Sequence, residues 1–118
     1  MRPEIALHQY CYLTTHGRRT GNPHTIEIWF SLEGKTLYLL AGNGERSDWV
    51  RNLRSQPQVE VRIDGVTYNA AGRVVTAIEE DQKVRQMLVL KYQSSYSDDL
   101  TSWGQTALPV ALVLAIEG

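Results

Sequence analysis

Short runs of alternating apolar and polar residues, separated by turn residues, recur along the chain and favour a small antiparallel sheet. Residues 24–31 alternate, so that Ile26 and Ile28 share one face of a half-buried strand. The hairpin at 58–75 is centred on Asp64-Gly65, a strong signal of a tight two-residue turn. These features predict strands joined mostly by hairpins.

The rest of the chain adds strands and two helices to this sheet. Further strands are predicted at 6–15, 36–42 and 107–116, and helices at 47–55 and about 77–92. A tight turn at 33–34 and a polar loop at 93–106 link them. The pattern indicates a mainly β (α+β) fold, a small antiparallel barrel of about six strands with two flanking helices.

Both predicted helices have a start signal and an apolar side. Ser47 is placed as the N-cap of the first helix, and Thr76 with Glu79 resembles a capping box before the second. The residues expected on the buried sides are Trp49, Val50 and Leu53 in the first helix, and Ile78, Val84, Met87 and Leu88 in the second.

Length and charge limit the classes of function. A chain of 118 residues argues for a single domain, 1–118. The net charge of −1 does not favour a nucleic-acid partner or a membrane-surface role. The longest apolar run, 107–116, is too short for a transmembrane segment. With no secretory signal and one cysteine, Cys11, the chain is expected to be cytoplasmic.

Motifs for metal or nucleophilic chemistry are absent from the sequence. There is no H-E-x-x-H or C-x-x-C spacing, and His16 and His24 lack an evident third ligand, so no metal is predicted. There is also no G-x-S-x-G elbow. Cys11 lies in a strand without a basic neighbour and is interpreted as a buried structural cysteine.

Two glycine-containing segments carry donors for an anion. Arg18 and Arg19 stand on the turn of "LTTHGRRTGNPH", where guanidinium and backbone N–H groups can meet phosphate or carboxylate. In "GNGERSDW", a loop that can form a backbone nest leads into a helix, and Arg46 and Ser47 add donors. Each segment alone is more often an ordinary solvated connection. Together they suit a long ligand with a phosphate and an acidic tail.

Aromatic residues form a third candidate element. Trp29 lies on the more polar face of its strand, and Tyr92, Tyr96 and Trp103 surround the polar loop at 93–106. Aromatic residues among Ser, Asp and Gly on a loop favour a binding surface.

With these motifs the chain resembles the deazaflavin-dependent nitroreductase family of split β-barrels, in the flavin/deazaflavin oxidoreductase superfamily. The resemblance covers about residues 12–65. Its most specific parts are T-T-x-G-R-[RK]-[ST]-G at 14–21 and W-x-x-N-L at 49–53. It implies a small antiparallel split β-barrel and an oxidoreductase that transfers hydride to an activated double bond, a quinone or a nitro compound.

The resemblance also implies a cofactor, coenzyme F420, a deazaflavin with a phosphodiester and a polyglutamate tail. The tail is expected along the basic hairpin, the phosphate at the loop and helix start, and the ring near the main chain of 41–43. The implied cofactor-binding residues are Arg18, Arg19, Ala41, Gly42, Asn43, Gly44, Arg46, Ser47 and Trp49. Because the superfamily includes FMN-binding members, FMN is the alternative cofactor. A third reading is a non-catalytic protein that binds a cofactor or an apolar ligand.

The implied substrate pocket is aromatic. Its residues are Trp29, Tyr92, Tyr96 and Trp103. Tyr96 is a candidate proton donor, and no other catalytic side chain is assigned. Where family members commonly have a Pro-Leu step after the hairpin, this chain places Glu27 and Trp29 close to the expected ring. Many related barrels are dimers, so a homodimer with a small-molecule substrate is expected.

Overall fold

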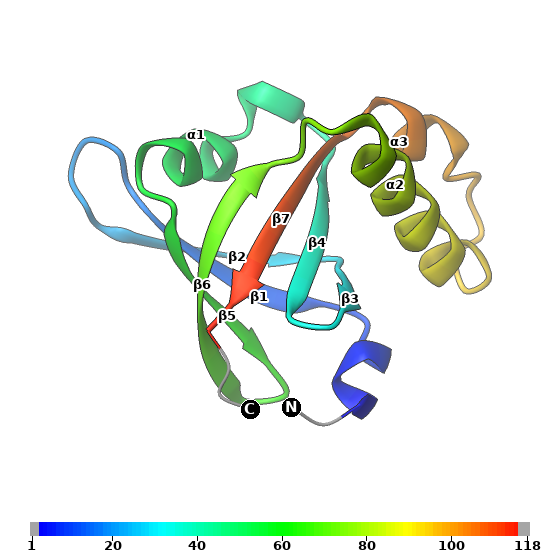
Figure 1. The fold of residues 1–118 in the computed structure, drawn as a ribbon, viewed down its shortest axis with the longest axis horizontal. Coiled ribbons are helices and arrows are strands. Elements are labelled where there is room, and N and C mark those ends of the chain that lie inside the picture. The colour runs from blue at the N-terminus through cyan, green and yellow to red at the C-terminus, as the bar shows by residue number, and fades with distance from the viewer. Residues whose placement is uncertain (1–2, 116–118) are drawn as a thin grey trace.

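A computed structural model describes residues 3–115 of the chain. In that range seven strands form one antiparallel sheet in the order β2-β1-β5-β6-β7-β4-β3, which curls into a half-barrel (Figure 1). The strands are β1 (Cys11–His16), β2 (Pro23–Ile28), β3 (Ser31–Glu33), β4 (Thr36–Ala41), β5 (Gln58–Ile63), β6 (Val66–Val74) and β7 (Leu108–Leu114). The predicted mainly β split-barrel fold is confirmed, with one strand more than expected.

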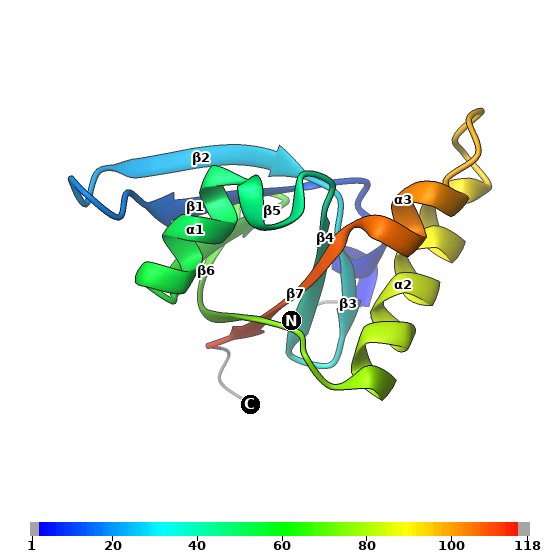
Figure 2. The same cartoon turned by 90° about the horizontal axis from the view of Figure 1, so that it is seen from above.

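The helices lie on two flanks of the curled sheet. They are α1 (Asp48–Ser55), α2 (Ile78–Gln93) and α3 (Thr101–Thr106), with 3-10 turns η1 (Pro3–Leu7) and η2 (Gly44–Arg46). Seen from above, α1 lies beside the β1–β2 hairpin, while α2 and α3 lie on the opposite flank (Figure 2). Helix α1 contacts β1 and β6, and α2 contacts β3, β4 and β7.

Strand β4 separates two hydrophobic cores because both of its faces are covered. Leu37 and Leu39 belong to the core inside the half-barrel, which also contains Leu53 of α1. Tyr38 and Leu40 belong to the second core, beneath α2 and α3. Helix α1 approaches β6 so closely that a Cβ on Gly72 would lie 2.5 Å from a methyl carbon of Leu53. The α1 contact therefore depends on a residue without a side chain in β6.

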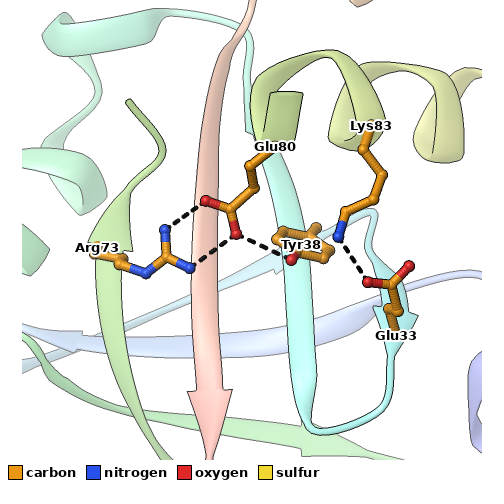
Figure 3. A network of polar contacts seen from close by, with 5 residues as sticks. All are labelled: Glu33, Tyr38, Arg73, Glu80 and Lys83. Atoms are coloured by element: carbon orange, nitrogen blue, oxygen red, sulfur yellow. Dashed lines mark hydrogen bonds and ion pairs between the residues drawn. The ribbon is translucent and has the colours of Figure 1, made fainter. Parts of the chain in front are cut away.

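A polar network fixes the first turns of α2 to the outer face of the sheet (Figure 3). Glu80 accepts two hydrogen bonds from the Arg73 guanidinium, at 2.7 and 2.8 Å, and one from the Tyr38 hydroxyl at 3.1 Å. One turn later, Lys83 donates to Glu33 of β3 at 2.7 Å. These bonds tie α2 to β3, β4 and β6 at once.

Some predicted boundaries are wrong. The strand predicted at 6–15 begins only at Cys11, because the residues before it include the short helix η1. The strand predicted at 24–31 ends at Ile28, and the chain turns there into β3. The loop predicted at 93–106 contains α3, whose six residues are too few to show a helical period. Of the strand predicted at 107–116, the last residue lies outside the described range.

The turn at Asp64-Gly65 is confirmed, since both residues have the positive φ angles, 52° and 78°, that this turn requires. The predicted N-cap position of Ser47 in α1 is confirmed, although its side chain makes no cap hydrogen bond. The predicted capping box of α2 is wrong, because the N-cap residue is Ala77 and not Thr76.

The predicted apolar sides of the helices are confirmed for most residues. Val50 and Leu53 of α1 are buried, as are Val84 and Leu88 of α2. Trp49 and Met87 are partly buried and pack against the two cores. The prediction that Ile78 is buried is wrong, because this first residue of α2 is 75% exposed to solvent.

Candidate functional site

The basic hairpin and the glycine loop, far apart in sequence, face each other across one cavity of about 960 Å³. The hairpin turn between β1 and β2 is closed by backbone bonds from Gly17 N–H to Asn22 O and from Gly21 N–H to Gly17 O, each 2.8 Å. The cavity is lined by Thr15, Gly17, Arg18, Arg19, Thr20, Pro23, His24, Thr25, Ile26, Gly42, Asn43, Ser47, Asp48, Trp49 and Asn52. We call it the basic cavity.

Helix α1 fixes the position of Arg18 in this wall. The guanidinium donates to Asn52 Oδ1 at 2.8 Å, and its other terminal nitrogen lies 3.5 Å from an Asp48 carboxylate oxygen. The Asn52 side chain, only 3% exposed, also donates to Thr15 Oγ1 at 3.3 Å. Asn52 therefore links the helix, the first strand and the arginine, a role that the sequence analysis did not assign to it beyond its place in W-x-x-N-L.

Arg19 and Arg46 form no ion pair with any of the residues that the structure describes. Arg19 lies in the wall of the basic cavity, and Arg46 lies in η2 beside it. Of the other predicted cofactor residues, Gly42, Asn43, Ser47 and Trp49 line the cavity. Ala41 is buried in the core, and Gly44 belongs to η2, outside the wall.

The start of α1 offers donors to an anion, although not those of the predicted nest. The N–H groups of Arg46 and Ser47 already bond to the carbonyls of Asn43 and Gly44, because the loop folds as a 3-10 turn. The bond from Arg51 N–H to Ser47 O is the first of the helical ladder, so three N–H groups before Arg51 have no acceptor in the helix. These N–H groups, together with the Ser47 hydroxyl, which makes no cap hydrogen bond, fit a phosphate group.

A second cavity, of about 440 Å³, lies beside the C-terminal end of β2. Its wall is formed by Glu27, Ile28, Trp29, Leu40, Tyr96, Leu100 and Trp103. The Trp29 ring meets Tyr96 and Trp103 edge to face, with centroids 5.3 and 5.5 Å apart. Three of the four aromatic residues predicted for the substrate pocket therefore come together in what we call the aromatic cavity.

Tyr92 supports this cavity from below and does not line it. Its buried ring stacks on Trp29, with centroids 4.2 Å apart and planes 6° from parallel. Its hydroxyl lies 2.7 Å from Gln9 O and accepts a bond from Phe30 N–H at 2.9 Å. Burial raises the pKa of this hydroxyl to about 12.

Beneath the same rings lies Lys91, whose ammonium donates to Phe30 O at 2.8 Å and stands 3.8 Å from the centre of the Phe30 ring. Burial lowers the pKa of Lys91 to about 8. Cys11 is buried as predicted, and burial raises the pKa of its thiol to about 12. Neither group belongs to the wall of either cavity.

The two cavities adjoin. Ile26 lines the basic cavity, and its neighbour Glu27 lines the aromatic one, so β2 is a shared wall. On the other side, a Cβ on Gly42 would lie 4.0 Å from Trp103 Cδ1, which brings the glycine loop into contact range of the aromatic cluster. An elongated ligand anchored at the basic hairpin can thus reach the aromatic rings.

Among residues 3–115, no three His, Cys, Asp or Glu side chains are grouped so that they could bind a metal ion. His16 lies 4.0 Å from Glu60, and His24 lines the basic cavity. None of the helices described combines the length and the apolar character needed to cross a bilayer.

Comparison with known proteins gives a family match over most of the chain. The family model described as F420H(2)-dependent quinone reductase matches residues 4–115.

Solved structures with the same fold include an F420-H2 dependent reductase, with 18% identity, a TM-score of 0.71, and coverage of 89% of this chain and 93% of that one. The heme storage protein HutZ from Vibrio cholerae has 15% identity, a TM-score of 0.75, and coverage of 97% and 87%. A protein described as a domain-swapped dimer has 19% identity, a TM-score of 0.71, and coverage of 89% and 79%. At these identities the likeness concerns the fold.

Proposed function

Since the chain belongs to the F420H(2)-dependent quinone reductase family, and so is an F420-dependent oxidoreductase, we propose that it reduces a small electrophilic acceptor in the aromatic cavity. The acceptor is a quinone, an activated double bond or a nitro compound. The observation that carries this proposal is the junction of a basic cavity with an aromatic one along β2.

The residues of the basic cavity fit the charged part of coenzyme F420. Arg18 and Arg19 would hold the carboxylates of the tail, since guanidinium groups bind carboxylates through paired hydrogen bonds. Ser47, Asn43 and the start of α1 would hold the phosphodiester, with Arg46 nearby. Gly42 lines the basic cavity within contact range of Trp103, so a ring system bound beside the glycine loop would lie next to the aromatic cavity.

The side chains of the aromatic cavity position the acceptor and exclude water from it. When bound, reduced F420 supplies the hydride, so that F420H2 and a quinone give F420 and the hydroquinone. Tyr96 is the proposed proton donor where the acceptor needs one, because its ring lies in the wall and its side chain is 43% exposed to exchange with solvent.

A fluorescence titration with F420, at two salt concentrations, tests the cofactor site. We expect the double variant R18A/R19A to bind F420 about tenfold or more weakly and with a shallower salt dependence, because charge-assisted bonds to the tail are lost. Matched titrations with FMN, which has no polyglutamate tail, should be insensitive to this change. Unchanged F420 affinity in the double variant would show that the tail does not bind at Arg18 and Arg19.

An acceptor screen with the F420-loaded protein then tests the reaction. Oxidation of the reduced cofactor, followed by its absorbance, should depend on a quinone, an enone or a nitroaromatic compound. Tight cofactor binding without turnover of any acceptor would favour the non-catalytic reading.

We also propose a homodimer. The structurally similar domain-swapped dimer supports it, as do β2 and β3, which have a hydrogen-bonded neighbour on only one side. Light scattering on the purified chain would give its mass in solution, and a monomer at micromolar concentration would refute the proposal. The cytoplasmic location remains a prediction from the sequence.

A further inference from the structure

We propose that the aromatic cavity selects positively charged aromatic acceptors over negatively charged ones, and that Glu27 determines this preference. The inference rests on the proposed function, since it names the substrate class of the same site. It follows from the arrangement of the rings, the single charge in the wall and the contrast with the adjoining cavity.

The rings form a partial cage for a planar cation. Trp29 is held flat against Tyr92, and Tyr96 and Trp103 turn their planes by 87° and 88° relative to it. Aromatic rings at right angles to one another therefore bound the cavity on more than one side. The faces of aromatic rings carry negative potential and attract cations.

The charge of the wall points the same way. Among the described residues that line the cavity, Glu27 is the one that carries a charge. The flanking segment 94–106 contains Asp98 and Asp99 but no Lys, Arg or His. Basic groups near the cluster are engaged elsewhere: Lys91 bonds to Phe30 O beneath the rings, and Arg85 pairs with Asp81. Arg62 lies over the ring of Tyr12, the cross-strand partner of Glu27, and does not line the cavity. An anionic acceptor would meet repulsion from Glu27 without a compensating cation among the described residues of the cavity wall.

The neighbouring basic cavity has the opposite character, with Arg18 and Arg19 in its wall against the single carboxylate of Asp48. A negatively charged group is thus attracted to the basic cavity, and the aromatic cavity favours acceptors without negative charge. The opposite charges of two adjoining cavities give specificity through repulsion as well as attraction.

The first test compares three benzoquinones that share one scaffold, with a trimethylammonium group, a sulfonate group or no charged group. With F420-loaded protein we expect kcat/KM for the cationic quinone to exceed that for the sulfonate by about tenfold, and E27Q to reduce this ratio to about twofold, since the rings still attract the cation. The uncharged quinone should change less than twofold. Glu79→Gln, an exposed position at the start of α2, is the matched control for the change in net charge.

The second test does not depend on turnover. Tryptophan fluorescence of the full chain, with and without cofactor, is titrated with benzyltrimethylammonium or benzenesulfonate, neither of which can be reduced as a quinone. We expect saturable binding of the cation that E27Q weakens about fivefold, and weaker binding of the sulfonate.

Equal binding of the two probes, or a preference of the same size in E27Q as in the parent, would overturn the inference even if quinones are reduced. Conversely, if no quinone is reduced while the cation still binds through Glu27, the proposed reaction fails and the charge preference stands.

Discussion

The Tyr92 hydroxyl joins helix α2 to the backbone just before β1, at Gln9, and just after β2, at Phe30. It accepts from Phe30 N–H at 2.9 Å and has two carbonyls within reach, Gln9 O at 2.7 Å and Phe30 O at 2.8 Å. We expect Tyr92→Phe to lower the free energy of unfolding by about 1–3 kcal/mol, because it leaves a buried N–H group without an acceptor. Urea denaturation measures this.

Tyr96→Phe is the matched control. Its ring contacts the same Trp29, but its side chain is partly exposed, so we expect stability within about 0.5 kcal/mol of the parent. If Y92F is as stable as Y96F, the buried hydroxyl is not an anchor. If Tyr96 is the proton donor, Y96F lowers kcat and leaves F420 affinity unchanged.

Single residues differ in how much of their role the sequence predicts. Cys11, Val50 and Leu53 are buried as expected, because apolar periodicity reports burial directly. Tyr92 shows what the sequence could not predict. Its position near a polar loop indicated an exposed aromatic residue. In the structure it is buried, because Trp29 packs on its ring and its hydroxyl bonds to the backbone at Gln9. Those contacts span more than 60 residues.

At the scale of elements, α1 acts as the support of the basic hairpin. Asn52 bonds to the Arg18 guanidinium and to Thr15, and Gln56 lies 3.5 Å from Gly17 O. We expect Asn52→Ala to weaken F420 binding about tenfold by releasing Arg18. Affinity for a deazaflavin that lacks phosphate and tail should change less than twofold, because the ring does not need the hairpin.

Both affinities come from fluorescence titrations, with circular dichroism showing that N52A is folded. Arg54→Ala is the control, since Arg54 lies on the same helix but pairs with Glu45 outside the basic cavity. Equal losses for F420 and the tailless compound would mean that Asn52 supports the whole helix and not the arginine.

The contacts of Glu80 that attach helix α2 to the sheet make the stability of the fold dependent on pH. The hydrogen bonds from Arg73 chiefly, and from Tyr38, lower the pKa of this carboxyl from 4.5 to about 2. A lowered carboxyl pKa stabilises the folded state above pH 4.5, and that contribution is lost as the pH falls toward 2. Because Arg73 is half exposed, we expect E80Q to cost only ~1 kcal/mol at pH 7.

Urea denaturation at pH 7 and near pH 2.5 measures this effect. The difference between the parent and E80Q should shrink at the lower pH, and E79Q should match the parent at both. A difference that is the same at the two pH values would show that the ion pair does not anchor α2.

Elements with strong local signals could be predicted, and those defined by distant contacts could not. The Asp64-Gly65 turn follows from backbone preferences of two residues. Helix α3 and the close approach of α1 to Gly72 have no local signal, because the first is too short for periodicity and the second depends on packing between elements. Likewise, the sequence placed Ser47 correctly at the N-cap of α1, but it could not show that the side chain makes no cap hydrogen bond there.

At the scale of the whole molecule, the sequence indicated two anion-binding segments, and the sheet order places them across one cavity. The fold also divides β2 along its length, since Pro23 to Ile26 line the basic cavity and Glu27 and Ile28 line the aromatic one. The strand itself was visible in the sequence. Which part of it meets which cavity was not, because that depends on the loop at Gly42 and on Trp103 of α3, both distant in the chain.

This division of charge predicts that salt acts on the two ligands differently. The net charge is only −1, so long-range attraction by the whole protein is weak, and binding of the anionic cofactor must depend on the local guanidinium groups. Salt at 0.5 M screens such exposed charges within ~5 Å, against ~14 Å at 0.05 M. We expect the Kd for F420 to rise about tenfold over this range, and KM for an uncharged quinone to change less than twofold. Titration and steady-state rates at matched salt measure both quantities. If the Kd for F420 and the KM for the quinone rise together, the two cavities do not differ in charge as proposed, and cofactor and acceptor share one electrostatic environment.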